Sequence, residues 1–167
     1  MSSTSVAHTV KDTILTAHAA WANRPYIWTL RDGVYESVTY GEIIGRACAV
    51  ASNLIDEGFR DAHIAIFARN SAEWVIADYA ISLSANVAVL MDATWQLLEA
   101  KNAALLVKPA ILYYDSSTKD VADTLKEYLP DTQFRSLNEL PGSLDSIPDV
   151  LPDRDPNDLA KIFFSSG

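Results

Sequence analysis

The sequence has little cysteine, histidine and glycine, and these shortages exclude several kinds of site. A single cysteine, Cys48, cannot form a disulfide within the chain, and its alanine and valine neighbours suggest a small buried apolar group. The three histidines are too far apart in sequence to match a usual metal-ligand spacing, so we expect no metal site. The six glycines are scattered, and they build neither a dinucleotide-binding turn nor a Gly-Lys-Ser/Thr loop. A nucleotide-dependent oxidoreductase or a P-loop NTPase is therefore disfavoured.

Basic residues and long hydrophobic runs are also scarce. The 167 residues include 13 basic and 22 acidic side chains, and the net charge of −9 would repel a nucleic acid, so we expect no nucleic-acid partner. The longest apolar region, 75–91, is interrupted by Asp78 and Asn86. A spanning helix needs about 20 predominantly apolar residues, so we expect no transmembrane segment. The N-terminus lacks a signal-peptide pattern, and cytoplasm is the expected location.

The hydrophobic residues that are present, 49% of the chain, alternate between helical and strand-like patterns. Aromatic and β-branched runs at 25–30 and 34–38 flank Asp32-Gly33, which is a strong hairpin signal. The helical patterns cover residues 10–21, 43–55, 74–83, 97–105 and 118–128. The strand patterns after the hairpin cover residues 63–68, 86–91, 110–115, 132–137 and a final apolar run at 159–164.

Several polar residues stand where helices are expected to begin or end. Thr39 with Glu42 and Asn70 with Glu73 have the spacing of capping boxes, and Thr94 is expected to cap the helix that follows it. Gly58 stands where a helix C-terminus needs positive φ. Together these signals predict an α/β fold with a mostly parallel sheet, helices on both of its faces and an N-terminal β-hairpin.

The end of the sequence is the candidate site. A buried strand is expected to open into Ser165-Ser166-Gly167, whose hydroxyl groups and flexible glycine backbone suit an anion. The carboxyl ends of parallel strands form the edge where ligands of open α/β sheets usually bind. Three residues alone cannot overrule the simpler interpretation as an ordinary polar loop, and that alternative stays open on this evidence.

Several segments, taken in order, resemble the adenylate-forming (AMP-binding) enzymes, a family of acyl-CoA synthetases, aryl-CoA ligases, luciferases and peptide-synthetase adenylation domains. The resemblance begins at Pro25 and is most specific around 69–74 and at the terminal Ser-Ser-Gly. Its acyl-CoA synthetase or fatty-acid-CoA ligase branch is the most similar. The segments that carry it are Val38-Thr39-Tyr40-Gly41-Glu42, the helix up to Gly58, 63–66, Arg69-Asn70-Ser71-Ala72-Glu73-Trp74, 80–89 and 158–167.

The resemblance implies that residues 1–167 are the N-terminal portion of a larger AMP-binding domain, cut at the start of its phosphate loop. Ser165, Ser166 and Gly167 would begin the loop that holds ATP. The complete enzyme would use ATP, Mg²⁺ and coenzyme A to convert a carboxylic acid, with a long-chain fatty acid as the expected substrate, into its thioester. The family's magnesium-binding and catalytic motifs lie further along, so no catalytic residue, no activity and no tightly bound cofactor are expected in these 167 residues.

Other possibilities remain open at this point. The chain could be a non-catalytic α/β binding or structural module, or the start of an aryl-CoA ligase or peptide-synthetase adenylation domain. It departs from the family at Ala85-Asn86, where glycine is common, and at Met91-Asp92-Ala93-Thr94, where proline is common. Faces left uncovered by a cut would also favour self-association.

Overall fold

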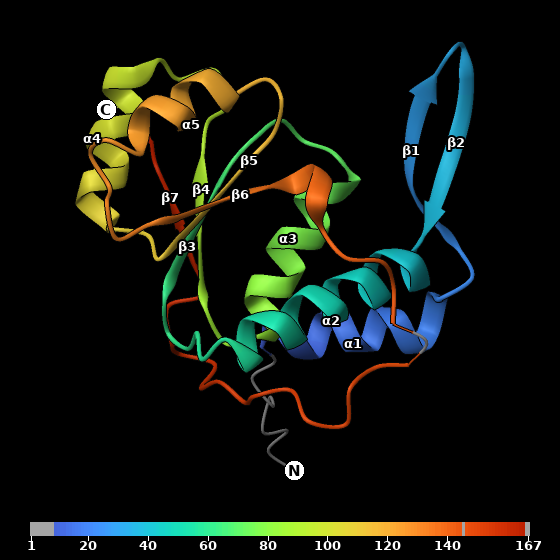
Figure 1. The fold of residues 1–167 in the computed structure, drawn as a ribbon. Coiled ribbons are helices and arrows are strands. Elements are labelled where there is room, and N and C mark those ends of the chain that lie inside the picture. The colour runs from blue at the N-terminus through green and yellow to red at the C-terminus, as the bar shows by residue number, and fades with distance from the viewer. Residues whose placement is uncertain (1–8, 145, 166–167) are drawn as a thin grey trace.

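The computed structural model describes residues 9–144 and 146–165, which form helices, a two-stranded hairpin and a five-stranded sheet (Figure 1). The α-helices are α1 (Val10–Trp21), α2 (Tyr40–Asp56), α3 (Ala72–Leu83), α4 (Leu97–Val107) and α5 (Lys119–Leu125), with a short 3₁₀ helix η1 (Leu137–Glu139). The strands are β1 (Pro25–Arg31), β2 (Val34–Thr39), β3 (His63–Phe67), β4 (Val87–Met91), β5 (Ile111–Tyr114), β6 (Gln133–Ser136) and β7 (Lys161–Phe163).

The five-stranded sheet has the order β6-β5-β3-β4-β7, and each neighbouring pair is parallel. Strands β3, β4 and β5 are almost wholly buried, as their continuous apolar sequences require when a sheet is covered on both faces. The antiparallel hairpin β1-β2 forms a separate sheet that projects away from the body (Figure 1). The predicted α/β class, parallel sheet and hairpin are confirmed.

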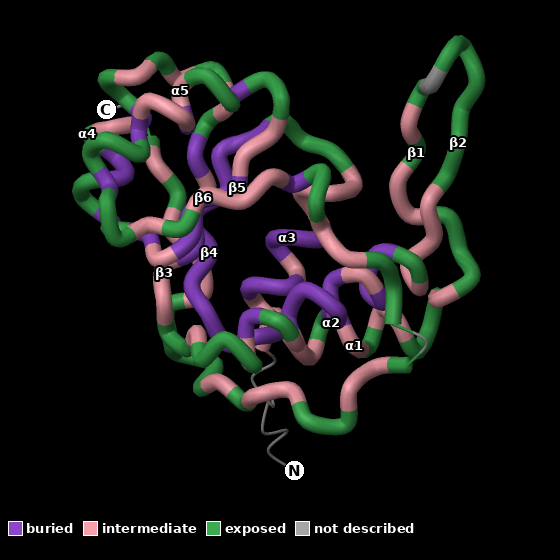
Figure 2. Tube along the Cα trace, in the orientation of Figure 1, coloured by how far each residue is buried: buried purple, intermediate pink, exposed green. Residues whose placement is uncertain are grey.

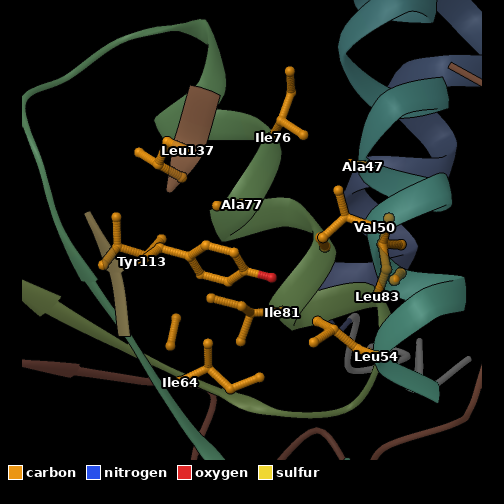
Figure 3. Packing of buried hydrophobic residues seen from close by; sticks show 14 of the residues in the cluster. Ala47, Val50, Leu54, Ile64, Ile76, Ala77, Ile81, Leu83, Tyr113 and Leu137 are labelled. Carbon is orange, nitrogen blue, oxygen red and sulfur yellow. The ribbon is translucent and has the colours of Figure 1, made fainter. Parts of the chain in front are cut away.

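Each face of the sheet carries its own hydrophobic cluster. Helices α1, α2 and α3 cover one face, and α4 and α5 cover the other (Figures 1 and 2). Alternate residues of β3 show the division, because Ile64 and Ile66 belong to the first cluster while Ala65 and Phe67 belong to the second. Figure 3 shows the first cluster, in which the Tyr113 ring of β5 points towards α3.

The helix caps explain where several elements begin and end. The Thr39–Glu42 capping box is present, and Gly58 has a φ of 84° after the end of α2, so both predictions are confirmed. The cap of α3 is Ser71, whose hydroxyl accepts a hydrogen bond from the Trp74 amide at 3.1 Å, so the prediction of Asn70 was wrong by one residue. Both residues are good caps, and the sequence pattern could not separate them.

Two other helix boundaries also differ from the prediction. Helix α4 begins after Gln96, and Thr94 instead donates backbone and hydroxyl hydrogen bonds to Asp92 in a turn before the helix. Helix α5 ends at Leu125, three residues before the predicted Tyr128, because residues 126–128 continue as a turn. The hydrogen bonds from Thr94 to Asp92 compete with a Thr94 cap at the first turn of α4.

Cys48 lies wholly inside the first cluster, as predicted, and burial raises the pKa of its thiol to about 11.

Gly45 leaves room for the chain that follows η1 to pack against α2, since a Cβ at this position would lie 2.1 Å from Ser143 Oγ. The neighbour of Gly45 is therefore this connection and not another helix. Among the described residues, no helix is both long and apolar enough to cross a membrane.

The corrected cap of α3 can be tested by comparing two adjacent substitutions. Ser71→Ala should lower the free energy of unfolding by about 1 kcal/mol, because the Trp74 amide loses its side-chain acceptor. Asn70→Ala is the matched control and should change it by less than about 0.5 kcal/mol, as expected for an exposed residue outside the cap. Urea denaturation of both variants measures the difference, and a larger loss for Asn70→Ala would contradict the assignment.

Candidate functional site

The candidate site lies at the carboxyl edge of the sheet, between the ends of β3 and β4. The chain leaves β3 through α3 on one face and leaves β4 through α4 on the opposite face. Adjacent parallel strands whose connections diverge in this way open a crevice at their carboxyl ends, which is the usual ligand position in open α/β sheets. The strand order therefore predicts a binding crevice at this point.

A cleft of about 870 Å³ occupies that position. Its wall combines the ends of three strands with the first turns of α3 and the approach to α4. The described residues that line it are Ala68, Arg69, Asn70, Trp74, Leu90, Met91, Asp92, Ala93, Trp95, Glu99, Phe163, Phe164 and Ser165. Residues from 68 to 165 therefore meet at one opening, where polar side chains lie beside aromatic ones.

Ser165 is exposed at the end of β7 and lines this cleft. The hydroxyl predicted to begin an anion-binding loop therefore shares an opening with Arg69 and Asn70. Ser166 and Gly167, the other two predicted site residues, lie outside the described residues. The neighbouring Phe164 packs edge-on against Trp95, with ring centroids 5.3 Å apart, which holds the end of the strand beside the approach to α4.

The Arg69–Asn70 corner between β3 and α3 is tied to the end of β5. The backbone amide of Arg69 donates a 3.0 Å hydrogen bond to the Asp115 carboxylate, and Thr118 Oγ1 donates to the carbonyl of Phe67. Burial raises the pKa of Asp115, but hydrogen bonds from Ser117, Arg69 and Thr118 outweigh it and leave the pKa below its ordinary value. The carboxylate is therefore held ionised as an acceptor.

The β4 side of the cleft has a second ordered carboxylate. Asp92 accepts hydrogen bonds from the Thr94 amide and hydroxyl, both at 2.8 Å, and these bonds lower the pKa of Asp92. The proline that the family often has near this position is replaced here by a turn that Asp92 and Thr94 close themselves. Asp92 therefore presents a negative charge to the cleft at neutral pH.

Strand β7 is only partly buried, unlike the buried strand predicted, and a largely buried ion pair ties it to helix α3. Lys161 Nζ lies 2.6 Å from Oδ1 of Asp78, and the Asp78 side chain is only 7% exposed. Ile162, on the other side of the strand, packs with the second cluster. Sequence reasoning treated Asp78 only as an interruption of an apolar run, because a partner 83 residues away leaves no local signal. The pair sets the position from which Ser165 emerges.

The charges of the cleft fit an anionic ligand only in part. Arg69, Asn70 and Ser165 offer polar donors, but Asp92 and Glu99 make the described wall net negative. The wall thus fits the hydrogen-bonding edge of a phosphate site and does not neutralise a triphosphate. In the described part of the chain, no group of three or more His, Cys, Asp or Glu side chains is placed to hold a metal ion.

A second hollow, of about 640 Å³, lies between the hairpin and the N-terminal part of α3. Its wall includes exposed apolar hairpin residues such as Trp28 and Leu30, together with an Arg46–Glu73 ion pair of 3.4 Å. It does not gather the carboxyl ends of the parallel strands. The cleft beside Ser165 is therefore the better candidate for nucleotide chemistry.

Comparison with known families agrees with this geometry. The AMP-binding enzyme family matches residues 16–167, which include every element of the parallel sheet and the whole described cleft. The chain belongs to this family. The resemblance inferred from the sequence is thereby confirmed at the level of the family.

Individual relatives share the fold and cover much of the chain. Long chain acyl-CoA synthetase 8 of Arabidopsis thaliana is 29% identical over 162 residues, which cover 81% of this chain and 22% of that protein. The structure of McyG A-PCP complexed with phenylalanyl-adenylate has a TM-score of 0.77 at 21% identity and covers 97% of this chain and 27% of that one. Anthranilate CoA ligase AuaEII in complex with anthranoyl-AMP has a TM-score of 0.80 at 17% identity, covering 96% and 32%.

The chain therefore spans about a fifth of the curated relative and roughly a quarter to a third of these two solved chains. ATP-bound MatB from Rhodopseudomonas palustris is similar too, with a TM-score of 0.67 and 22% identity over 87% of this chain and 30% of that one. At these identities the solved structures establish the fold alone.

The buried ion pair yields a stability prediction. Lys161→Met should lower the free energy of unfolding by about 3 kcal/mol, because the Asp78 carboxylate stays buried without its cation. Lys119→Met breaks an exposed pair with Asp123 and should lower the free energy of unfolding much less, because water screens exposed charges. Chemical denaturation compares them.

A double variant provides the internal check. Asp78→Leu with Lys161→Met should recover most of the loss, since neither charge is then left buried without a partner. Equal losses for Lys161→Met and Lys119→Met would show that the buried pair does not hold β7.

Proposed function

We propose that residues 1–167 are the N-terminal portion of the large domain of an ATP-dependent acyl-CoA synthetase acting in the cytoplasm. The observation that carries this proposal is the position of Ser165, at the end of β7 and in the cleft where the connections of β3 and β4 diverge. We further propose that Ser165, Ser166 and Gly167 begin the loop that binds the phosphates of ATP. Family membership and the acyl-CoA synthetase relative support the assignment.

The complete reaction would have two steps. In the first, a carboxylate oxygen of the substrate attacks the α-phosphorus of ATP. A new O–P bond forms, the bond to pyrophosphate breaks, and the product is an acyl-adenylate. In the second, the thiol of coenzyme A loses its proton and attacks the acyl carbonyl, releasing AMP and forming the thioester. A long-chain fatty acid is the substrate we propose, because the curated relative is a long chain acyl-CoA synthetase.

The residues described here would contribute binding and orientation. Ser165 and Asn70 offer neutral donors to phosphate oxygens, and the Arg69 guanidinium offers positive charge from the end of β3. Mg²⁺ would supply the further positive charge that Asp92 and Glu99 make necessary. Stabilisation of a transferring phosphoryl group depends on such charges, so we propose that this chain alone does not adenylate a carboxylate.

Two other assignments compete with this one. The structural neighbours include an aryl-CoA ligase and an adenylation module, so the acyl-CoA assignment rests on the curated relative. A non-catalytic α/β module is the second, and it predicts no preference of the cleft for phosphates. Ligand binding at Ser165 separates this module from the enzymes.

The phosphate-loop proposal can be tested by nuclear magnetic resonance on the ¹⁵N-labelled chain. Millimolar ATP and pyrophosphate should shift the amide signals of Asn70 and Ser165, because both ligands carry the phosphates that these residues would contact. Adenosine, the matched control without phosphate, should leave them unchanged. Equal shifts with adenosine, or shifts confined to residues outside the cleft, would contradict the proposal.

The expected inactivity has its own assay. Carboxylate-dependent exchange of labelled pyrophosphate into ATP should stay at background with the purified 167 residues, across short, long and aromatic acids. A full-length acyl-CoA synthetase assayed in parallel shows that the conditions support exchange. Exchange above background with any acid would show that the chain completes adenylation by itself and would identify the class of acid.

A further inference from the structure

We propose that Asp115 is a positioning residue that fixes the Arg69–Asn70 corner of the cleft, an inference that rests on the proposed phosphate site. Asp115 follows β5, which pairs with β3 on the side of the sheet away from β7. It does not line the cleft, but its carboxylate reaches the backbone of Arg69, which does. Its influence on a ligand would therefore act through the corner.

Both carboxylate oxygens of Asp115 are acceptors. Oδ2 accepts the Arg69 amide at 3.0 Å. Oδ1 accepts the amide and hydroxyl of Ser117 at 2.9 and 2.7 Å and the amide of Thr118 at 3.2 Å. The first oxygen joins the end of β5 to the corner after β3, and the second orders the turn that leads into α5. One side chain thus couples two loops that are 46 residues apart.

A separate hydrogen bond holds the strand just before the corner. Thr118 Oγ1 donates to the Phe67 carbonyl at 2.5 Å, and Thr118 is buried. The last residue of β3 therefore has a hydrogen bond of its own from Thr118, although the Thr118 amide and hydroxyl also lie 3.2 and 3.3 Å from Oδ1 of Asp115. Asp115 itself acts two residues later, where the chain turns towards α3. Ser71 then begins α3 with its own cap. The corner is held between these two fixed points, and the Asp115 bond constrains its backbone orientation.

Asparagine at position 115 would separate the two roles of this carboxylate. It has nearly the same shape, but only one of its terminal atoms accepts, and the other is an NH₂ donor. The oxygen is expected to stay with the several donors of Ser117 and Thr118, which places the NH₂ group against the Arg69 amide. Two donors then face each other, so the corner loses its bond while the turn after β5 keeps its own.

The experiment compares amide hydrogen exchange at Arg69 and Ser117 in the wild-type chain, Asp115→Asn and Asp155→Asn. Asp115→Asn should speed exchange at Arg69 about tenfold or more and leave Ser117 nearly unchanged. Asp155 is the matched control, because its Oδ1 alone accepts both hydrogen bonds from Asn157, and asparagine can replace it there. Asp155→Asn should therefore leave Arg69 unchanged.

Two further measurements make the result decisive. A scalar coupling across the hydrogen bond, between the Arg69 amide nitrogen and the Asp115 carboxyl carbon, should be detectable in the wild-type chain and does not depend on any variant folding. Asp115→Asn should also weaken the pyrophosphate response at Asn70 and Ser165 about three- to tenfold, as expected for an altered donor geometry.

The outcomes distinguish this inference from the proposed function. Unchanged Arg69 exchange in Asp115→Asn, equal acceleration at Ser117, or absence of the coupling in the wild-type chain would overturn the positioning role. A wild-type chain in which pyrophosphate shifts neither Asn70 nor Ser165 would overturn the phosphate site instead, and the Arg69 amide would still decide the role of Asp115. An unchanged pyrophosphate response in Asp115→Asn, with Arg69 exchange accelerated, would overturn its influence on the ligand.

Discussion

The arrangement of the molecule depends on burying a parallel sheet on both faces. Strands β3, β4 and β5 carry apolar side chains in both directions, so each face needs its own helices. The chain meets this need by passing α3 across one face and α4 across the other, which reverses its direction along the sheet. The reversal separates the loops after β3 and β4, and the cleft occupies the space between them. The position of the site is thus a consequence of how the core is covered.

Polar contacts at both edges of the sheet keep this layered core in register. At the carboxyl edge, Asp115 and Thr118 connect the ends of β3 and β5. At the opposite edge, the buried Asn86 side chain accepts from the Ala62 amide and donates to the Phe59 carbonyl. Because buried polar groups are costly without partners, each of these side chains favours one arrangement of the loops over others. The apolar clusters supply most of the burial, and these bonds restrict how the strands end.

Much of the fold could be predicted from local patterns, since those patterns express local physics. The hairpin at Asp32-Gly33, the capping box at Thr39 and the helix stop at Gly58 each depend on residues within a few positions. One error came where two neighbouring residues could perform the same task. Asn70 and Ser71 can both cap a helix, and only the path of the chain out of β3 selects Ser71.

Of the residues at the candidate site and around it, only those at the end of the sequence, beginning with Ser165, could be predicted as site residues. Ser165 carried a motif signal, whereas Asp115 and Lys161 act through partners 46 and 83 residues away. Such pairs have no spacing rule, and they become visible only when the strand order is known. The structure also explains how the chain accommodates alanine at position 85, where the family commonly has glycine. Ala85 adopts a φ of 55°, a conformation that favours glycine, and the adjacent Asn86 stabilises this turn through bonds to Ser84.

The electrostatics of the cleft connect its structure with its proposed chemistry. Asp92 and Asp115 are both held ionised by short-range hydrogen bonds, yet they face different ways: Asp92 lines the opening, and Asp115 accepts bonds behind it. A wall with Arg69 opposed by Asp92 and Glu99 would bind a polyphosphate weakly unless other positive charge arrived with it. Such a wall is suited to a divided site, in which these residues orient the ligand and groups outside them supply the charge. In the proposed phosphate site, the corner at Arg69 would act mainly by orienting the ligand, because one guanidinium cannot offset the charge of a triphosphate.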